Sequence, residues 1–170
     1  MRDVAIILCT WLHLIVMVVW IGHMANAWLL FGPLSRKYVS SNVYGDFIAE
    51  YRTKDRPVAL SCIAVFFVTG LVMTLLNEQY RGIGNVFANS WSILLFVKHI
   101  LILAMIGLGV YQGSRVMPGL AKAGQELAKH NDSDTATQVA KFEKARYRVT
   151  QTLCIIALIV LLLTAIGQIA

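Results

Sequence analysis

Two histidines lie inside the first long hydrophobic run of this chain, at positions where a membrane would place hydrocarbon. His13 and His23 both occur between about Val4 and Phe31. An ionisable side chain at membrane depth is costly, so it usually faces a bundle interior and serves a function. Imidazole nitrogens ligate haem iron and copper, and these are the chemistries that the two positions suggest first.

A second polar pair, Lys98 and His99, lies in the third hydrophobic run. From a helical rise of about 1.5 Å per residue, His13 lies roughly 14 Å below the outer surface, and the Lys98–His99 pair roughly 10 to 12 Å. Similar depth on two helices predicts that the pair faces His13. His23 lies about 15 Å deeper than His13 on a different face, so the two cannot share a mononuclear site.

Only one member of the Lys98–His99 pair can point at His13, because neighbouring helical residues project about 100° apart. His99 is the easier ligand, since a lysine must lose its proton before it can bind a metal. Lys98 stays open as the alternative. The other member of the pair would face a neighbouring helix, a phosphate head group or a partner subunit.

Haem b is the first cofactor that this arrangement predicts. Side chains from two facing helices can clamp the iron axially inside a helix bundle. The macrocycle also needs space, which glycines could leave beside it: Gly70, Gly107 and Gly109.

Copper is the alternative, because imidazole and thioether groups both suit it. His13, Met17, Trp20 and Met24 form one stripe of the first helix, at offsets of 4, 7 and 11 residues. With His23, this stripe could form a copper path along the helix. Met73 and Met105 also lie within hydrophobic runs.

Each of these residues also has a simpler structural role. A histidine can bond a hydroxyl or carbonyl across a helix interface, and this is the simplest role for His23. Lys98 can extend toward the membrane surface, methionines can fill a core, and glycines can let helices approach.

The composition predicts that transmembrane helices position these side chains. Of 170 residues, 58% are hydrophobic and 14% are charged, which is typical of an integral membrane protein. We expect a single all-α domain, residues 1–170, built as a four-helix transmembrane bundle. The four spans are 4–31, 57–76, 91–112 and 149–169, the first ending at Gly32-Pro33 and the second beginning at Pro57.

The distribution of basic residues predicts the orientation of the bundle. Segments 32–56 and 113–148 hold twelve lysines and arginines, whereas the opposite side holds Arg2 and Arg81. The positive-inside rule makes these two segments cytoplasmic and places both termini on the outer, periplasmic side of a bacterial inner membrane. The net charge of +6 therefore indicates membrane topology and anionic lipid rather than a nucleic-acid partner.

The cytoplasmic segments can still contain helices. Residues 116–148 predict an amphipathic helix, a break at Asn131–Asp134, and a helix that continues into the fourth span, capped by Asp132 or Ser133. The three cysteines lie in apolar runs without CxxC spacing, so we expect small buried side chains and no disulfide framework. No cleavable signal peptide is expected.

The first helix resembles that of the CopD-like membrane family, which has a His, a Trp seven residues later and a Gly two residues after that. His13, Trp20 and Gly22 match this pattern. Val68-Thr69-Gly70 and the run from Trp91 to Lys98 also resemble the family. The related HemJ group of four-helix protoporphyrinogen oxidases is similar in its first-helix His and third-helix Lys.

The two branches imply different functions. The CopD-like branch implies copper uptake or resistance, and the HemJ branch implies haem b held through His13 and Lys98. The chain departs from HemJ at Gly22 and from Asn26 to Phe31. It also has four spans, where longer CopD proteins have eight.

The predicted function is that of a haem b protein for one-electron transfer, a subunit of a larger respiratory or quinone-linked complex with other membrane or periplasmic redox subunits. Copper transport or resistance and HemJ-like oxidation are the alternatives. No catalytic residues are predicted, because no acid–base pair, nucleophile or phosphate loop occurs. The cofactor-binding residues are His13, His99, Lys98, Trp20 and Gly70, with His23 as a weaker metal ligand.

Overall fold

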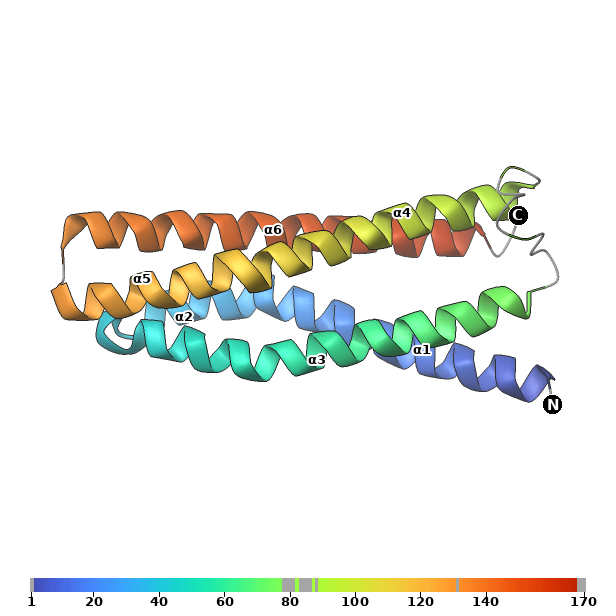
Figure 1. The fold of residues 1–170 in the computed structure, drawn as a ribbon, viewed down its shortest axis with the longest axis horizontal. Helices are drawn as coiled ribbons and strands as arrows, with labels where there is room; N and C mark the ends of the chain where they lie inside the picture. Colours follow the sequence, from blue (N-terminus) through green and yellow to red (C-terminus); the bar gives the residue numbers. More distant parts are fainter. Residues whose placement is uncertain (1, 78–81, 83–86, 88, 131, 168–170) are drawn as a thin grey trace.

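The structure is a computed structural model that describes residues 2–77, 82, 87, 89–130 and 132–167 (Figure 1). Within these residues every regular element is a helix. In chain order the elements are α1 (Arg2–Asn26), the π-helical turn η1 (Ala27–Phe31), α2 (Gly32–Tyr38), α3 (Ser41–Leu75), α4 (Ser90–Tyr111), the π-helical turn η3 (Gln112–Val116), α5 (Met117–His130) and α6 (Ser133–Ile166).

These elements form four long rods, each apolar enough over part of its length to cross a membrane. The rods are α1–η1–α2, α3, α4–η3–α5 and α6. A helix of 35 residues such as α3 is about 50 Å long, whereas the hydrocarbon core is about 30 Å thick. Each rod therefore combines a spanning stretch with a polar extension. The predicted all-α bundle with four spans is confirmed.

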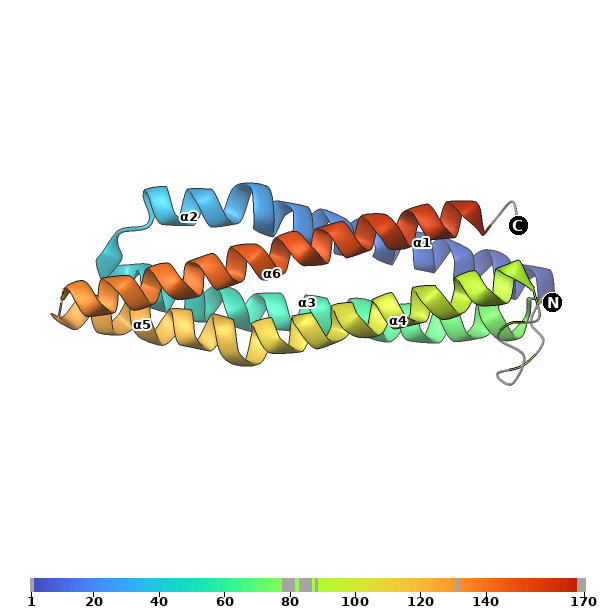
Figure 2. The same ribbon diagram turned by 90° about the horizontal axis from the view of Figure 1, so that it is seen from above.

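The two ends of the bundle differ (Figures 1 and 2). Both chain termini lie at one end, which we call the terminal end. At the other, the hairpin end, α2 joins α3 and α5 joins α6. The basic residues of 32–56 and 113–148 lie on the rods toward the hairpin end, so the two segments predicted as cytoplasmic loops are helical extensions.

The first rod continues past Gly32-Pro33, where the apolar run ends, as far as Tyr38. Directly before Pro33 the chain widens into η1, where the Gly32 N–H bonds to the carbonyl five residues earlier. The same device precedes Pro118, where the Met117 N–H bonds to Gln112. Proline lacks an N–H and its ring collides with a preceding carbonyl, so a wider turn lets the helix continue.

The sequence predicts that Pro57 begins the second helix. In the structure Pro57 instead lies inside α3. Its missing N–H costs a hydrogen bond in a helix interior. Pro57 is exposed, so water or head groups can satisfy the carbonyl that it leaves free. The predicted break between α5 and α6 is confirmed: Asp132 caps α6 by accepting from Thr135 N at 2.6 Å. Asn131 lies outside the described residues.

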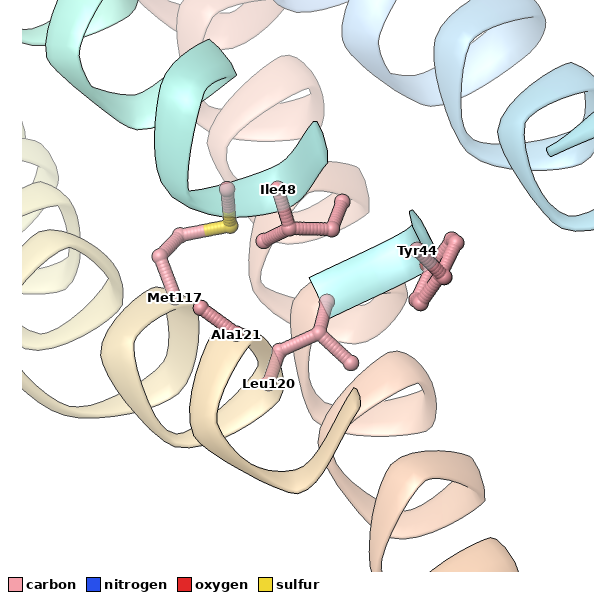
Figure 3. Close-up of a cluster of buried hydrophobic side chains, with 5 residues drawn as sticks. All are labelled: Tyr44, Ile48, Met117, Leu120 and Ala121. Atoms are coloured by element: carbon pink, nitrogen blue, oxygen red, sulfur yellow. The ribbon is translucent and has the colours of Figure 1, made fainter. Parts of the chain in front are cut away.

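Two buried clusters hold the rods together. The first, at the hairpin end, joins α3 to α5 through Tyr44, Ile48, Met117, Leu120 and Ala121 (Figure 3). The second, nearer the middle of the bundle, joins α1, α4 and α6 through Met24, Met105, Leu153 and Ala157. Most other apolar side chains of the spans face outward, as expected for helices surrounded by lipid.

Candidate functional site

The imidazole of His13 is held between α1 and α3. Its Nδ1 lies 2.7 Å from the hydroxyl oxygen of Thr69, which is buried. The Thr69 hydroxyl in turn donates to the carbonyl of Val65, also at 2.7 Å. This contact crosses the interface between α1 and α3.

The Thr69 contact fits the His13 tautomer that suits a metal ligand. When the Thr69 hydroxyl donates to Val65, its oxygen accepts from His13, and Nδ1 carries the proton. The neutral ring then presents Nε2 as a free lone pair. Metal-binding histidines are commonly oriented in this way, with one nitrogen donating to a neighbouring group and the other available to the metal.

The walls around His13 come from the same two helices. Phe66 packs edge-on against the imidazole, with ring centroids 4.8 Å apart, and the Trp20 ring also packs edge-on with Phe66 at 6.2 Å. Gly70 lies beside the ring, because a Cβ there would be 3.8 Å from His13 Cε1. Gly107 and Gly109 face open space instead, so they neither bring helices of this chain together nor border His13.

Lys98 and His99 of α4 point in different directions. Lys98 is half-buried and lies within electrostatic range of His13. His99 is exposed, and its Nδ1 lies 2.7 Å from the carbonyl of Leu95 on its own helix. The structure thus brings Lys98 toward His13 and turns His99, the ligand favoured by chemistry alone, toward the outside.

His23 has a partner that the sequence did not identify. Its Nε2 lies 2.6 Å from Oδ1 of Asp55, which makes an ion pair when His23 is protonated. Asp55 also interacts with the hydroxyl of Tyr51, one turn earlier on α3. The sequence predicts a cytoplasmic loop around Asp55. In the structure α3 begins before Pro57, and this N-terminal part of the helix brings Asp55 against α1.

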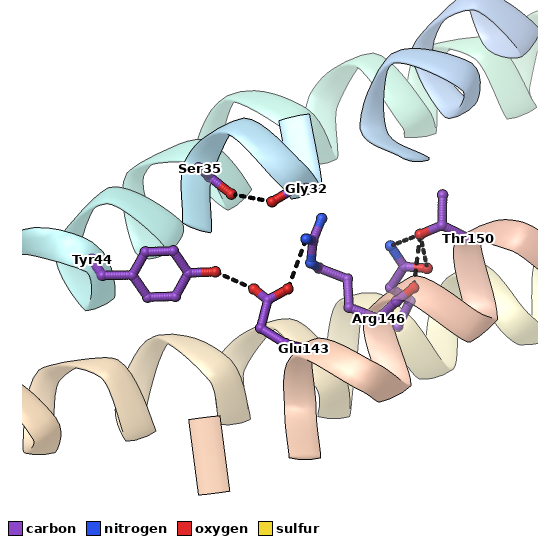
Figure 4. Close-up of polar contacts among 7 residues, drawn as sticks. Gly32, Ser35, Tyr44, Glu143, Arg146 and Thr150 are labelled. Carbon is purple, nitrogen blue, oxygen red and sulfur yellow. Dashed lines mark hydrogen bonds and ion pairs between the residues drawn. The ribbon is translucent and has the colours of Figure 1, made fainter. Parts of the chain in front are cut away.

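A buried charge network lies further toward the hairpin end (Figure 4). Arg146 donates to Glu143 at 2.9 Å, and Tyr44 of α3 donates to the other oxygen of the same carboxylate. The two charged side chains are 4% and 3% exposed. The Arg146 guanidinium also lies 5.6 Å from the centre of the Phe31 ring in η1.

This network fixes the first π-helical turn against α6. A Cβ at Gly32 would lie 2.7 Å from a terminal nitrogen of Arg146, so the glycine leaves room for the guanidinium. Ser35, also buried, returns a hydrogen bond to the Gly32 carbonyl at 3.1 Å. Tyr44 of α3 and Phe31 of η1 both contact charged residues of α6, so the network anchors three rods to one another.

Thr69, Asp55 and Glu143 are the functional or anchoring residues that sequence reasoning did not select. Thr69 stands in the quoted Val68-Thr69-Gly70 segment and lies at the depth of His13, so a search for hydroxyl partners could have found it. Within the part of the chain that the structure describes, no three His, Cys, Asp or Glu side chains gather as a metal cluster.

Comparison with known proteins gives one result. The family model described as CopD, copper resistance protein D, matches residues 56–167, which include Thr69, Gly70 and Lys98 but not His13 or His23. No curated protein and no solved structure matches the chain. The resemblance to the HemJ group has no support from these comparisons. Since the match covers well over half of a four-span membrane protein, the chain belongs to the CopD family.

Proposed function

We propose that the protein handles copper in a bacterial inner membrane, and that His13 supplies a ligand in the terminal half of the bundle. The observation that carries this proposal is the match to the copper resistance protein D family. Copper is the cargo in this proposal. The orientation of His13 supports the choice of residue, because Thr69 occupies Nδ1 and leaves Nε2 free.

Lys98 limits how copper can bind at His13. A protonated ammonium and a copper ion repel each other, so copper ligation requires Lys98 to be neutral or turned away. The long methylene stem lets the ammonium reach the head-group region at the terminal end. His99, on the outer side of α4, is not part of the proposed site.

Haem b is the second candidate, favoured by the electrostatic interaction between Lys98 and His13. His13 Nε2 and the Lys98 amine would hold the iron, with Gly70 leaving room beside the imidazole. The function would then be one-electron transfer within a larger respiratory or quinone-linked assembly.

Metal content and visible spectrum of the purified protein test both proposals. Copper without a Soret band is expected for copper handling, and His13→Ala should lower the copper content while His99→Ala should not. A Soret band, a sharp α-band after reduction and about one iron per chain would instead establish haem. Absence of both metals from protein loaded with copper and with haemin would overturn both proposals.

A further inference from the structure

The buried cluster between α1, α4 and α6 is rich in sulfur. Met24 and Met105 are 6% and 8% exposed and belong to one contiguous cluster with Leu153 and Ala157. Cys154, a free thiol, packs against this cluster from α6. Three helices therefore each bring one sulfur-bearing side chain to the same buried region.

The choice of residues at these contacts is unusual for such apolar helices. Among the described side chains of α1, Met24 alone is buried. In α4 the buried residues are Ser92 and Met105. Both helices are rich in Leu, Ile and Val, which pack with better defined rotamers, yet the buried hydrophobic residue of each is a methionine.

Thioether and thiol groups have a defined metal preference. These soft ligands select Cu(I), whereas harder ions prefer carboxylates, carbonyls and water. Uncharged methionines suit a monovalent ion at membrane depth. The Cys154 thiol would release its proton to the solution as its sulfur binds copper. The resulting pair of thiolate and Cu(I) carries no net charge, which limits the cost of burial.

The cluster also continues the stripe that begins at His13. Met17 and Trp20 lie between His13 and Met24 on the less exposed side of α1. Met24 is 11 residues beyond His13, or about 16 Å further toward the hairpin end. A soft site at this depth lies beyond the reach of His13 and is a separate binding position.

We propose that Met24, Met105 and Cys154 form an intramembrane Cu(I) site. The proposal rests on the proposed function in taking copper as the cargo, but the ligand chemistry is its own. The site accepts copper from the His13 region and holds it in the reduced state. Ag(I), which has the same ligand preference, is a second probe.

The test is a competitive titration of the full chain in detergent with Cu(I), held by a coloured chelator under reducing, oxygen-free conditions. The variants are Met24→Leu, Met105→Leu and Cys154→Ala, which remove sulfur while largely preserving the packing of the core. Each should weaken Cu(I) and Ag(I) binding about tenfold or more. Met73→Leu is the matched control, since Met73 lies outside the cluster, and should leave binding unchanged.

The outcomes of this titration distinguish failure of the sulfur site from failure of the proposed function. Copper binding that is lost in His13→Ala but retained in all three sulfur variants would overturn the sulfur site alone. Loss in the sulfur variants with retention in His13→Ala would support it and remove His13 from the ligand set. Wild-type protein that binds neither Cu(I) nor Ag(I) would overturn both.

X-ray absorption of the Cu(I)-loaded wild type gives a readout that does not depend on how the variants fold. Sulfur neighbours around copper are expected. A shell of nitrogen or oxygen alone would overturn the assignment.

Discussion

The Thr69 hydroxyl contacts Nδ1 of His13, the ring nitrogen that the proposed copper site does not use. Hydrogen bonds to the outer side of a ligating histidine fix both its tautomer and its ring orientation. Thr69 accepts from Nδ1 when its own proton is donated to Val65. In the proposed site, the residue that orients the ligand is thus on α3, whereas the ligand His13 is on α1.

Thr69→Val tests this role. The valine has nearly the shape of threonine but cannot accept from His13, so the ring is free to protonate Nε2. We expect the affinity for the metal or haem bound at His13 to fall about 10- to 100-fold. Thr69→Ser, which restores the hydroxyl, should restore binding, and equal affinity in all three proteins would contradict the role.

The buried pair of Glu143 and Arg146 makes a stability prediction. Glu143→Gln removes the carboxylate charge and leaves the guanidinium buried without compensation. We expect a loss of about 3–5 kcal/mol in the free energy of unfolding, measured by denaturation in detergent.

The exposed pair of Glu126 and Lys129 is the control for that measurement. Their side chains are 40% and 64% exposed. Glu126→Gln should change the free energy of unfolding by less than about 1 kcal/mol. A similar loss in both variants would show that burial does not distinguish the two pairs.

At the level of elements, the sequence predicts the four spans because long apolar runs have few other structures available to them. It does not predict that the rods continue through charged segments. Continuation past Pro33 depends on a π-helical turn, which is stabilised by contacts of Phe31 and Gly32 with Arg146. Such tertiary contacts cannot be read from local composition.

For the candidate site, too, some features can be predicted from the sequence and others depend on tertiary contacts. That Lys98 and His13 come within electrostatic range could be predicted from counting residues along apolar runs. The directions of Lys98 and His99 could not, because they depend on how α4 is rotated against its neighbours. Asp55 was missed because its part of the chain was assigned to a loop.

The crossing of α3 and α5 depends on two glycines. A Cβ at Gly45 would lie 2.7 Å from the Ala121 carbonyl, and one at Gly124 would lie 2.8 Å from Gly45 Cα. Gly45→Ala should therefore force the helices apart, at a cost of about 1–3 kcal/mol in unfolding free energy. Gly107→Ala, in open space, should instead stabilise α4 by about 0.5–1 kcal/mol. Equal effects would contradict the close crossing.

The cap of α6 makes a prediction about pH. The Thr135 N–H bonds to Asp132 and lowers the pKa of that carboxyl below its ordinary value. A lowered folded-state pKa means that the contribution to stability is present above the ordinary carboxyl pKa and is lost as pH falls through the lowered one. Asp132→Asn should keep the cap and lose this pH dependence, whereas Asp132→Ala should lose both. Hydrogen exchange of the first turn of α6 measures the effect.

At the level of the whole molecule, charge is sorted along the bundle. Basic side chains gather on the rods toward the hairpin end, and apolar ones cover the terminal half. We infer that the hairpin end faces the cytoplasm, by the positive-inside rule. A reporter active only outside the cytoplasm, fused after Ala170, should therefore be active. The same reporter inserted at residues 39–40 should be inactive, and the reverse pattern would contradict the orientation.

The two π-helical turns have a consequence for how the rods would respond to a deletion. Each turn holds one residue more than a regular helix would need, and one residue corresponds to a rotation of about 100°. Below each turn the rod therefore meets its neighbours on a face that a regular helix would direct elsewhere. Removing a single residue from Ala27–Phe31 would swing Gly32 away from Arg146 while leaving His13 and Met24 in place. Each turn thus rotates the following part of the rod about the helix axis. The packing of the hairpin end is therefore set independently of the packing inside the membrane.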